Sequence, residues 1–444
     1  MYYNRIEKIF KYSKELGADH VEVMIQKSRG EDVSCRNGSI ETINKKDSLH
    51  TGIRILKNSK QIIISTSDIS DLSLKETMEK GMEVVKFVDE DPYCGLGDCF
   101  SNTYSLPYLD CYDFSQPRTE DLIERVKIME NVAFRTSGIT NIENCSAGWN
   151  QTLSIITNTK GFFLSFPVSN HFNSLSIVSG ESEDAQTDSD KNVKVYLEDL
   201  YSPEDFSSKV TNMAIKKLNP RKIKSQRIPV IFHPRAGKII LRYFTQLING
   251  VNIVQEGKSY LQGHLGKQIF SSAINIIDDP HLIRGLRSLP VDFEGSLCKK
   301  KMVVESGVLK SWLLDLRSSR KIKMQSTGNA KRSINDIPRP YPTNFYIAGG
   351  FIPKEDLFKL VKKAFYVTDL MGSGFDKITG NYSEGAKGFW IENGEIAYPI
   401  NKVAIAGNFK EMFQNIVVAN DLYFEYDINT PTFLIEEMIL SGTD

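Results

Sequence analysis

Two carboxylates stand two positions apart in the segment 291–295, which reads VDFEG. In a strand, alternate side chains lie on the same face, so this spacing predicts that Asp292 and Glu294 project together. Such a pair can work as a general acid and a general base, or it can accept hydrogen bonds from the amides of an extended peptide. A solvated strand face without chemistry is the alternative interpretation, and the spacing alone favours it.

A second polar cluster follows in the segment 326–332, which reads STGNAKR. Glycine permits a close approach of the backbone, and an asparagine with an arginine can hold a peptide backbone or a carboxylate. A structural turn is the simpler explanation of the same residues. The candidate substrate-cleft residues are therefore Asp292, Glu294, Thr327, Gly328, Asn329 and Arg332.

The sequence lacks the common motifs for metal binding and for nucleophilic catalysis. Its six histidines, at positions 20, 50, 171, 233, 264 and 281, include no pair separated by three to five residues. His233 precedes Pro234 at an expected helix start, where a histidine more often closes a strand than binds a metal. There is no G-x-S-x-G motif. In GNYSEGAK (380–387) an alanine separates the last glycine from the lysine, unlike in a phosphate-binding loop.

The cysteines do not predict a metal site either. Six cysteines in 444 residues are too few for a dense disulfide framework. Cys94, Cys99 and Cys111 are separated by five and twelve positions, which match no common zinc knuckle, and no histidine lies near them. We therefore expect reduced thiols with a structural role.

Charge is balanced over the whole chain, with 55 Lys and Arg against 55 Asp and Glu, so no global field favours nucleic acid or a membrane. Residues 216–227 contain six basic residues and are expected to form a solvated linker rather than a phosphate-binding patch. The N-terminal sequence MYYNRIEKIFKYSKELG lacks the apolar core of a signal peptide. Ser, Asn and Pro interrupt the uncharged stretch 161–180 too often for a membrane span. The sequence thus predicts a cytoplasmic protein without direct contact to nucleic acid or membrane.

The first half of the chain alternates between strand and helix patterns. Strands are expected at 19–26, 39–44, 51–56, 61–66, within 141–179, and at 193–201. Asn37-Gly38 should form a hairpin turn, and Ser202 with Pro203 should begin a helix that runs to 218. Further helices are expected at 70–88 and 120–136, and a long loop at 89–116.

A strand at 228–232 and a helix after Pro234 open the second half, with Gly250 as the expected helix stop. Turn signals then become dense; the expected strands are 303–305, 311–316, 397–400 and 403–406, and the expected helices are 355–364 and 410–418. The order of elements predicts an α+β fold with two domains. Residues 1–220 would form an N-terminal domain of strand meanders and helices, and residues 221–444 a strand-dominated, barrel-like domain.

A series of short motifs extends over nearly the whole length of the chain. They are VEV (21–23), RNGSIE (36–41), GL (95–96), KSYLQGHLG (258–266), IDDP (277–280), DFEG (292–295), GVLKSWLLD (307–315), STGNAKR (326–332), TGNYSEGAKGFWIENGEIAYP (379–399), IAGNF (405–409) and AND (419–421). Each motif is short, but in their order and spacing the sequence resembles the TldD/PmbA family. Members of this family have been described as modulators of DNA gyrase and as subunits of a cytoplasmic metalloprotease.

Two branches of this family differ in their chemistry. The TldD branch carries His-Glu-x-x-x-His on the helix after Pro234 and a late cysteine, a set that can bind zinc and activate water. With Gly250 as anchor, the corresponding positions here are Leu241, Arg242 and Gln246. The segment before Pro431 reads LYFEYDINT, without a cysteine. The resemblance is therefore to the TldE branch, also called PmbA, and implies no cofactor in this chain.

The resemblance also implies a role and partners. This chain would be the non-catalytic subunit of a metalloprotease that acts on peptides or unfolded segments, in a homo- or hetero-dimer. Zinc would be supplied by a TldD-like catalytic subunit. An alternative from another class is a self-associating peptide-binding or regulatory protein without a role in proteolysis. A third alternative, a peptidase with displaced metal ligands, is the least favoured.

Overall fold

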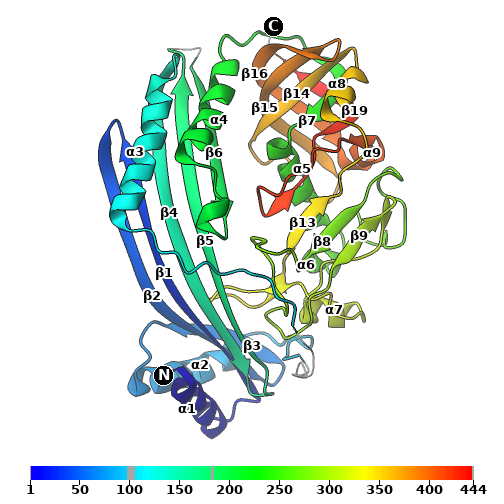
Figure 1. Ribbon diagram of the computed structural model, residues 1–444. Coiled ribbons are helices and arrows are strands. Elements are labelled where there is room, and N and C mark those ends of the chain that lie inside the picture. The colour runs from blue at the N-terminus through cyan, green and yellow to red at the C-terminus, as the bar shows by residue number, and fades with distance from the viewer. Residues whose placement is uncertain (1, 98–105, 182–184, 443–444) are drawn as a thin grey trace.

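The computed structural model describes residues 2–97, 106–181 and 185–442. A long curled sheet and a barrel stand side by side in Figure 1. The fold is α+β, and the predicted barrel-like C-terminal region is confirmed. Cys99, in the expected long loop, lies outside the described residues; the described residues 106–118 of that region contain no helix or strand.

The N-terminal sheet has the strand order β3-β2-β1-β4-β5-β6, and all its pairings are antiparallel. Its strands are β1 (His20–Arg36), β2 (Ser39–Lys57), β3 (Lys60–Thr66), β4 (Ile139–Asn158), β5 (Phe163–Ser179) and β6 (Gln186–Lys194). The turn at Asn37-Gly38 is confirmed, with φ of 53° and 79°. β2 is one strand, not two as predicted. β3 pairs only with residues 51–57 of β2. The earlier part of β2 is therefore an exposed sheet edge, and its side chains do not alternate between apolar and polar.

Helices cover one face of this sheet. They are α1 (Tyr2–Glu15), α2 (Asp71–Val84), α3 (Thr119–Arg135) and α4 (Pro203–Lys216), with a 3₁₀ turn, η1 (Val85–Phe87), after α2. α1 and α2 share an apolar core with one end of the sheet, and α3 and α4 share another core with the other end. The predicted start of α4 is confirmed, because Ser202 Oγ accepts a hydrogen bond from the amide of Asp205 at 3.0 Å. The opposite face of the sheet is left for the C-terminal half.

The predicted strand at 193–201 is wrong. β6 ends at Lys194, and a 3₁₀ turn, η3 (Leu197–Asp199), follows it. The chain leaves the sheet here because it bonds to the loop that precedes α3. Asp113 accepts a hydrogen bond from the amide of Leu197 at 2.9 Å, and Asp110 accepts one from the Tyr196 hydroxyl at 2.5 Å. These long-range contacts override the local strand pattern.

A closed barrel forms the core of the C-terminal half. Its strands are β7 (Gln226–Phe232), β14 (Lys363–Met371), β15 (Asn381–Glu392), β16 (Glu395–Asn408) and β19 (Phe433–Ser441). Pairing of β16 with β19 closes it, and β17 (Ile416–Val418) adds to β19. Helix α5 (Pro234–Leu247) packs its apolar face into the same core, whereas α8 (Lys354–Lys359) and α9 (Phe409–Gln414) connect strands. Both connecting helices are shorter than predicted, because a strand begins a few residues after each one.

A smaller sheet lies below the barrel in Figure 1. Its strand order is β10 (Val308–Leu309), β9 (Lys301–Glu305), β8 (Ile276–Asp279), β13 (Asn344–Ile347) and β18 (Ile428–Asn429). β11 (Ala330–Lys331) pairs separately with β12 (Arg339–Pro340). The predicted strand at 311–316 is wrong, because Asp315 caps helix α7 (Leu316–Lys321). Gly250 begins the short helix α6 (Gly250–Ile253), and a Cβ at this position would lie 2.4 Å from Ser318 Oγ.

Buried ion pairs join the two halves at the basic segment 216–227. Lys217 is 2% exposed and pairs with Asp188 at 3.0 Å and with Asp369. Arg235 binds the same two carboxylates from the start of α5. The predicted solvated linker is therefore wrong for Lys217, because its ammonium group is held between two acids. Among the described helices, none has the length and apolarity that a membrane crossing requires.

Candidate functional site

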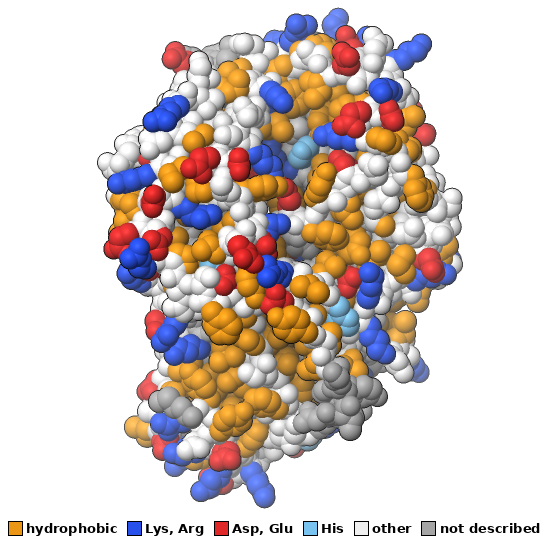
Figure 2. Space-filling model, in the orientation of Figure 1, with side chains coloured by type: hydrophobic (Ala, Val, Ile, Leu, Met, Phe, Trp, Pro, Cys, Tyr) orange, Lys and Arg blue, Asp and Glu red, His pale blue; other side chains and the backbone are white. Residues whose placement is uncertain are grey.

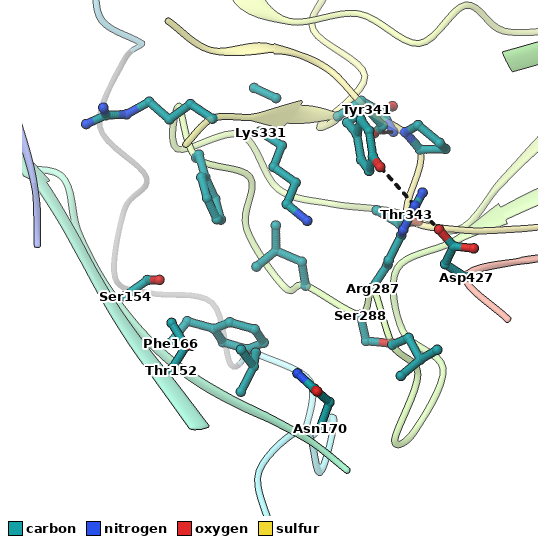
Figure 3. Close-up of a pocket in the computed structure, with 18 of the residues that line it drawn as sticks. Thr152, Ser154, Phe166, Asn170, Arg287, Ser288, Lys331, Tyr341, Thr343 and Asp427 are labelled. Atoms are coloured by element: carbon teal, nitrogen blue, oxygen red, sulfur yellow. Dashed lines mark hydrogen bonds and ion pairs between the residues drawn. The ribbon is translucent and has the colours of Figure 1, made fainter. Parts of the chain in front are cut away.

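A cavity of about 520 Å³ lies between the uncovered face of the N-terminal sheet and the C-terminal half. Figure 3 shows this interdomain cavity, and Figure 2 shows basic and acidic side chains along the boundary between the halves. The sheet contributes Met24, Thr152, Ser154, Phe166 and Asn170, and the opposite wall includes Arg287, Leu289, Phe293, Lys331, Tyr341 and Asp427. Its volume is in the range of sites for small ligands, roughly 300–1,000 Å³.

Asp292 lies in a buried turn rather than on a strand face. Val291 makes a single bridge with Leu297, and Gly295 has a φ of 88°, so the chain turns where a strand was predicted. The Asp292 carboxylate accepts the amides of Glu294, Ser296 and Ala330 at 2.8–3.0 Å. Burial raises its pKa to about 6. This side chain orders the turn, and it does not line the cavity.

Glu294 belongs to a buried charge cluster with Glu22, Arg54 and Arg332. Glu294 lies 3.7 Å from an Arg54 nitrogen, Arg54 lies 4.0 Å from Glu22, and Arg332 Nε lies 3.1 Å from Glu22. Burial raises the pKa of Glu294 to about 8, while Arg54 opposes that rise. Because β1 and β2 contribute Glu22 and Arg54, this cluster ties the N-terminal sheet to the C-terminal half.

The loop 326–332 forms one wall of the cavity. Gly328 has a φ of 69°, and a Cβ there would lie 2.6 Å from the carbonyl oxygen of Leu297. Asn329 donates to Asp278 at 2.8 Å and accepts from Lys301 at 3.0 Å, so its amide is already engaged. Thr327 accepts the amide of Leu314 at 2.7 Å. Gly328, Asn329 and Arg332 line the cavity, whereas Asp292, Glu294 and Thr327 do not.

The charged groups that face the cavity are mostly ones that the sequence did not single out. Arg287 donates to the Tyr341 hydroxyl at 2.9 Å and binds Asp427, and its guanidinium lies 4.4 Å from the centre of the Tyr341 ring. Figure 3 shows the Lys331 amine projecting into the cavity. Consecutive residues of an extended chain point in opposite directions. Lys331 and Arg332 therefore point in opposite directions: Lys331 projects into the cavity, and the Arg332 guanidinium lies beside Glu22 on β1.

The helix positions that would correspond to a zinc motif do not fit a metal. Leu241 has no donor atom and is buried in the barrel core, whereas Arg242 and Gln246 are exposed. His233 Nδ1 accepts the amide of Arg235 at 3.1 Å, and burial lowers the pKa of His233 to about 3. In residues 2–97, 106–181 and 185–442, no three His, Cys, Asp or Glu side chains are grouped so that they could hold a metal ion.

The described cysteines are free thiols. Cys35, Cys111, Cys145 and Cys298 are buried, and Cys94 is partly buried. Burial raises the pKa of Cys111 to about 12, which keeps this thiol protonated and unreactive. Their burial agrees with the predicted structural role, which stays a prediction.

Comparison with known proteins covers the whole chain. Residues 21–85, 112–218 and 225–442 match, in order, PmbA/TldA metallopeptidase domain 1, the central domain and the C-terminal domain. The metalloprotease PmbA of Escherichia coli O157:H7 is 30% identical over 96% of this chain and 93% of its own length. A PmbA homolog of Buchnera aphidicola (from Acyrthosiphon pisum) is 30% identical over 99% of this chain and 96% of its own.

Solved structures share the fold. A candidate modulator of DNA gyrase from Bacteroides thetaiotaomicron superposes with a TM-score of 0.91 at 20% identity, over 99% of each chain. TldE from Thermococcus kodakarensis superposes with a TM-score of 0.86 at 21% identity, over 99% of this chain and 100% of its own. The three matched domains and the full-length similarity to PmbA show that this chain belongs to the PmbA/TldD metallopeptidase family.

Proposed function

We propose that this chain is the PmbA/TldE-like, non-catalytic subunit of a cytoplasmic metalloprotease that acts on peptides or unfolded segments. A TldD-like partner supplies the zinc and the catalytic groups, in a hetero-oligomer, and this chain helps to hold the substrate. The observation that carries the proposal is helix α5. Its motif positions hold Leu241 in the core and Arg242 and Gln246 on the surface, so a zinc site cannot be built from them.

The interdomain cavity supports the substrate-holding part of the proposal. Polar side chains of β4 and β5 face an apolar and basic wall across a space that is large enough for part of a peptide. Within the candidate cleft, Gly328, Asn329 and Arg332 line this space. Asp292, Glu294 and Thr327 act behind the wall by holding the turn and the loop in place.

The experiment is reconstitution with a companion chain that carries His-Glu-x-x-x-His, encoded in the same genome. Sedimentation of the mixture should give a hetero-oligomer, and hydrolysis of an unstructured peptide should occur only in the mixture. Metal analysis of the separated subunits should find zinc in the companion alone. If the companion alone is as active as the mixture, the subunit role is wrong. If this chain only self-associates and binds peptide, the regulatory alternative replaces it.

A further inference from the structure

The charges that line the interdomain cavity are unbalanced. Within the described residues they are Arg287, Lys331, Arg332 and Asp427. Arg332 is turned toward Glu22, so two cations face one carboxylate in the cavity itself. Asp427 pairs with Arg287 and also, at 3.5 Å, with Arg242, which does not line the cavity. Lys331 is therefore left without an ion-pair partner among the described residues.

Arg287 and Lys331 also have N–H donors without a hydrogen-bond partner among the described residues. Lys331 makes no hydrogen bond or ion pair with any described residue, and its amine lies 5.2 Å from the centre of the Tyr341 ring. One terminal nitrogen of Arg287 is buried and has no hydrogen-bond partner among the described residues. A buried donor without a partner costs about 1–3 kcal/mol, a cost that a bound anion would remove once the guanidinium turned this nitrogen toward it. Neighbouring Arg and Lys donors of this kind suit a carboxylate.

The charge balance favours a monoanion. Among the lining residues, Arg287 and Lys331 together with Asp427 leave one net positive charge, and Asp427, which Arg242 also contacts, would repel a second negative charge on a ligand. Apolar side chains line the same cavity, namely Leu286, Leu289, Phe166 and Phe293. Ser154 and Asn170 add hydrogen-bonding groups from the sheet, whereas the Thr152 hydroxyl already bonds to Ser28 and Asn150. The ligand that satisfies all three features has one carboxylate, an apolar body and amides.

We propose that the interdomain cavity binds the C-terminal carboxylate of a peptide with an apolar last residue, and that Arg287 and Lys331 hold the carboxylate. The peptide assignment rests on the proposed function, which gives peptides as substrates. The site, however, is made by this chain alone. Desolvation and the nearby Arg287 lower the pKa of Lys331, and a bound carboxylate would raise it again.

The test is calorimetric binding to the purified full chain without any partner. The probes are an N-acetylated tetrapeptide that ends in leucine with a free carboxylate, the same peptide with a C-terminal amide, and hexanoate. The acid should bind roughly tenfold or more tightly than the amide, as one or two charge-assisted hydrogen bonds provide. Equal affinity of acid and amide would overturn the proposal. Hexanoate binding as tightly as the peptide would show a small-acid site and overturn the peptide assignment.

Variants locate the effect. Lys331→Gln should weaken binding of the acid by roughly tenfold and leave binding of the amide unchanged, because only the acid uses the ammonium group. Arg287→Lys keeps the charge, and it should weaken binding of the acid less than Lys331→Gln does. Lys299→Gln, at an exposed position outside the cavity, is the matched control and should bind like the parent. If the Lys331→Gln variant binds the acid as tightly as this control does, the assignment of Lys331 to the carboxylate is refuted.

Because the binding assay uses this chain alone, its outcome does not depend on whether the chain assembles with a catalytic partner. Loss of acid-over-amide selectivity would refute the carboxylate site even if the chain assembled with a zinc-bearing companion. Selectivity in a chain that fails to assemble would leave the site in place and refute the subunit role.

Discussion

Replacing Glu294 by glutamine should raise the free energy of unfolding above that of the parent protein, and this advantage should grow as the pH rises. Glu294 is 4% exposed, and burial raises its pKa from an ordinary 4.5 to about 8 although Arg54 lies 3.7 Å away. The raised pKa means that the folded state prefers the protonated acid. The stabilisation is complete below the unfolded-state pKa and is lost as the pH rises through about 8.

The size of the effect follows from the same pKa values. At about 1.4 kcal/mol for each pKa unit, ionising Glu294 costs the folded state up to about 5 kcal/mol between pH 4.5 and 8. Glutamine cannot ionise, and its carbonyl oxygen can still accept the Leu316 amide that Glu294 accepts at 2.8 Å. The stability advantage of Glu294→Gln should therefore grow by roughly 1.4 kcal/mol per pH unit from pH 5 to 8. Asp292 titrates in both proteins, and because its charge also raises the pKa of Glu294, the difference between the two proteins includes this coupling.

Urea unfolding of the two proteins at pH 5.5, 7 and 8.5, followed by circular dichroism, measures this difference. Glu305→Gln is a suitable control, because that side chain is 55% exposed and the variant should parallel the parent at every pH. The reasoning fails if Glu294→Gln is destabilised by about 3–5 kcal/mol at all three pH values. That result would mean that Glu294 is ionised in the folded state and that its attraction to Arg54 outweighs the cost of burial.

Other expectations concern the metal and the junction between the halves. Elemental analysis of the purified chain after dialysis against a weak chelator should show no stoichiometric zinc; one tightly held zinc per chain would contradict this. The triple variant Leu241→His, Arg242→Glu and Gln246→His should bind zinc weakly and hydrolyse no peptide alone, since a third protein ligand and supporting groups are missing. Chelator-sensitive hydrolysis by that variant would refute the claim. Lys217→Met should lower the free energy of unfolding by about 1.5–3 kcal/mol in a denaturant titration, because it removes one of the two cations that hold the buried Asp188 and leaves only Arg235. An unchanged midpoint would show that Arg235 suffices for both carboxylates.

Local chemistry made part of this fold predictable. Asn37-Gly38 forms its turn because both residues tolerate positive φ, and Ser202 with Pro203 begins a helix through a cap that only neighbouring residues need to form. The barrel-like half was foreseen from its dense turns. The helix positions of the zinc motif were located through the family resemblance, and the side chains of Leu241, Arg242 and Gln246 then predicted that they could not bind zinc.

Long-range contacts decided what the sequence could not show. Lys217 stands in a run of basic residues that looks solvated, yet two acids distant in sequence enclose it. Asp292 and Glu294 have strand spacing, but the turn at Gly295 buries both. Arg332 was the more conspicuous residue for binding a carboxylate. Its partner Glu22 comes from β1, and the freely projecting cation is its neighbour Lys331.

The topology of the barrel sets an order for its assembly during synthesis. β7 pairs with β14 and β19, which the ribosome makes much later, whereas the N-terminal sheet is complete before β7 appears. Until then the apolar segment 228–232 emerges with both edges open, and such strands readily pair with other chains. A ribosome that stalls before Phe433 would thus release a finished N-terminal sheet attached to an aggregation-prone strand. Demand for chaperones should accordingly concentrate on the second half of the nascent chain.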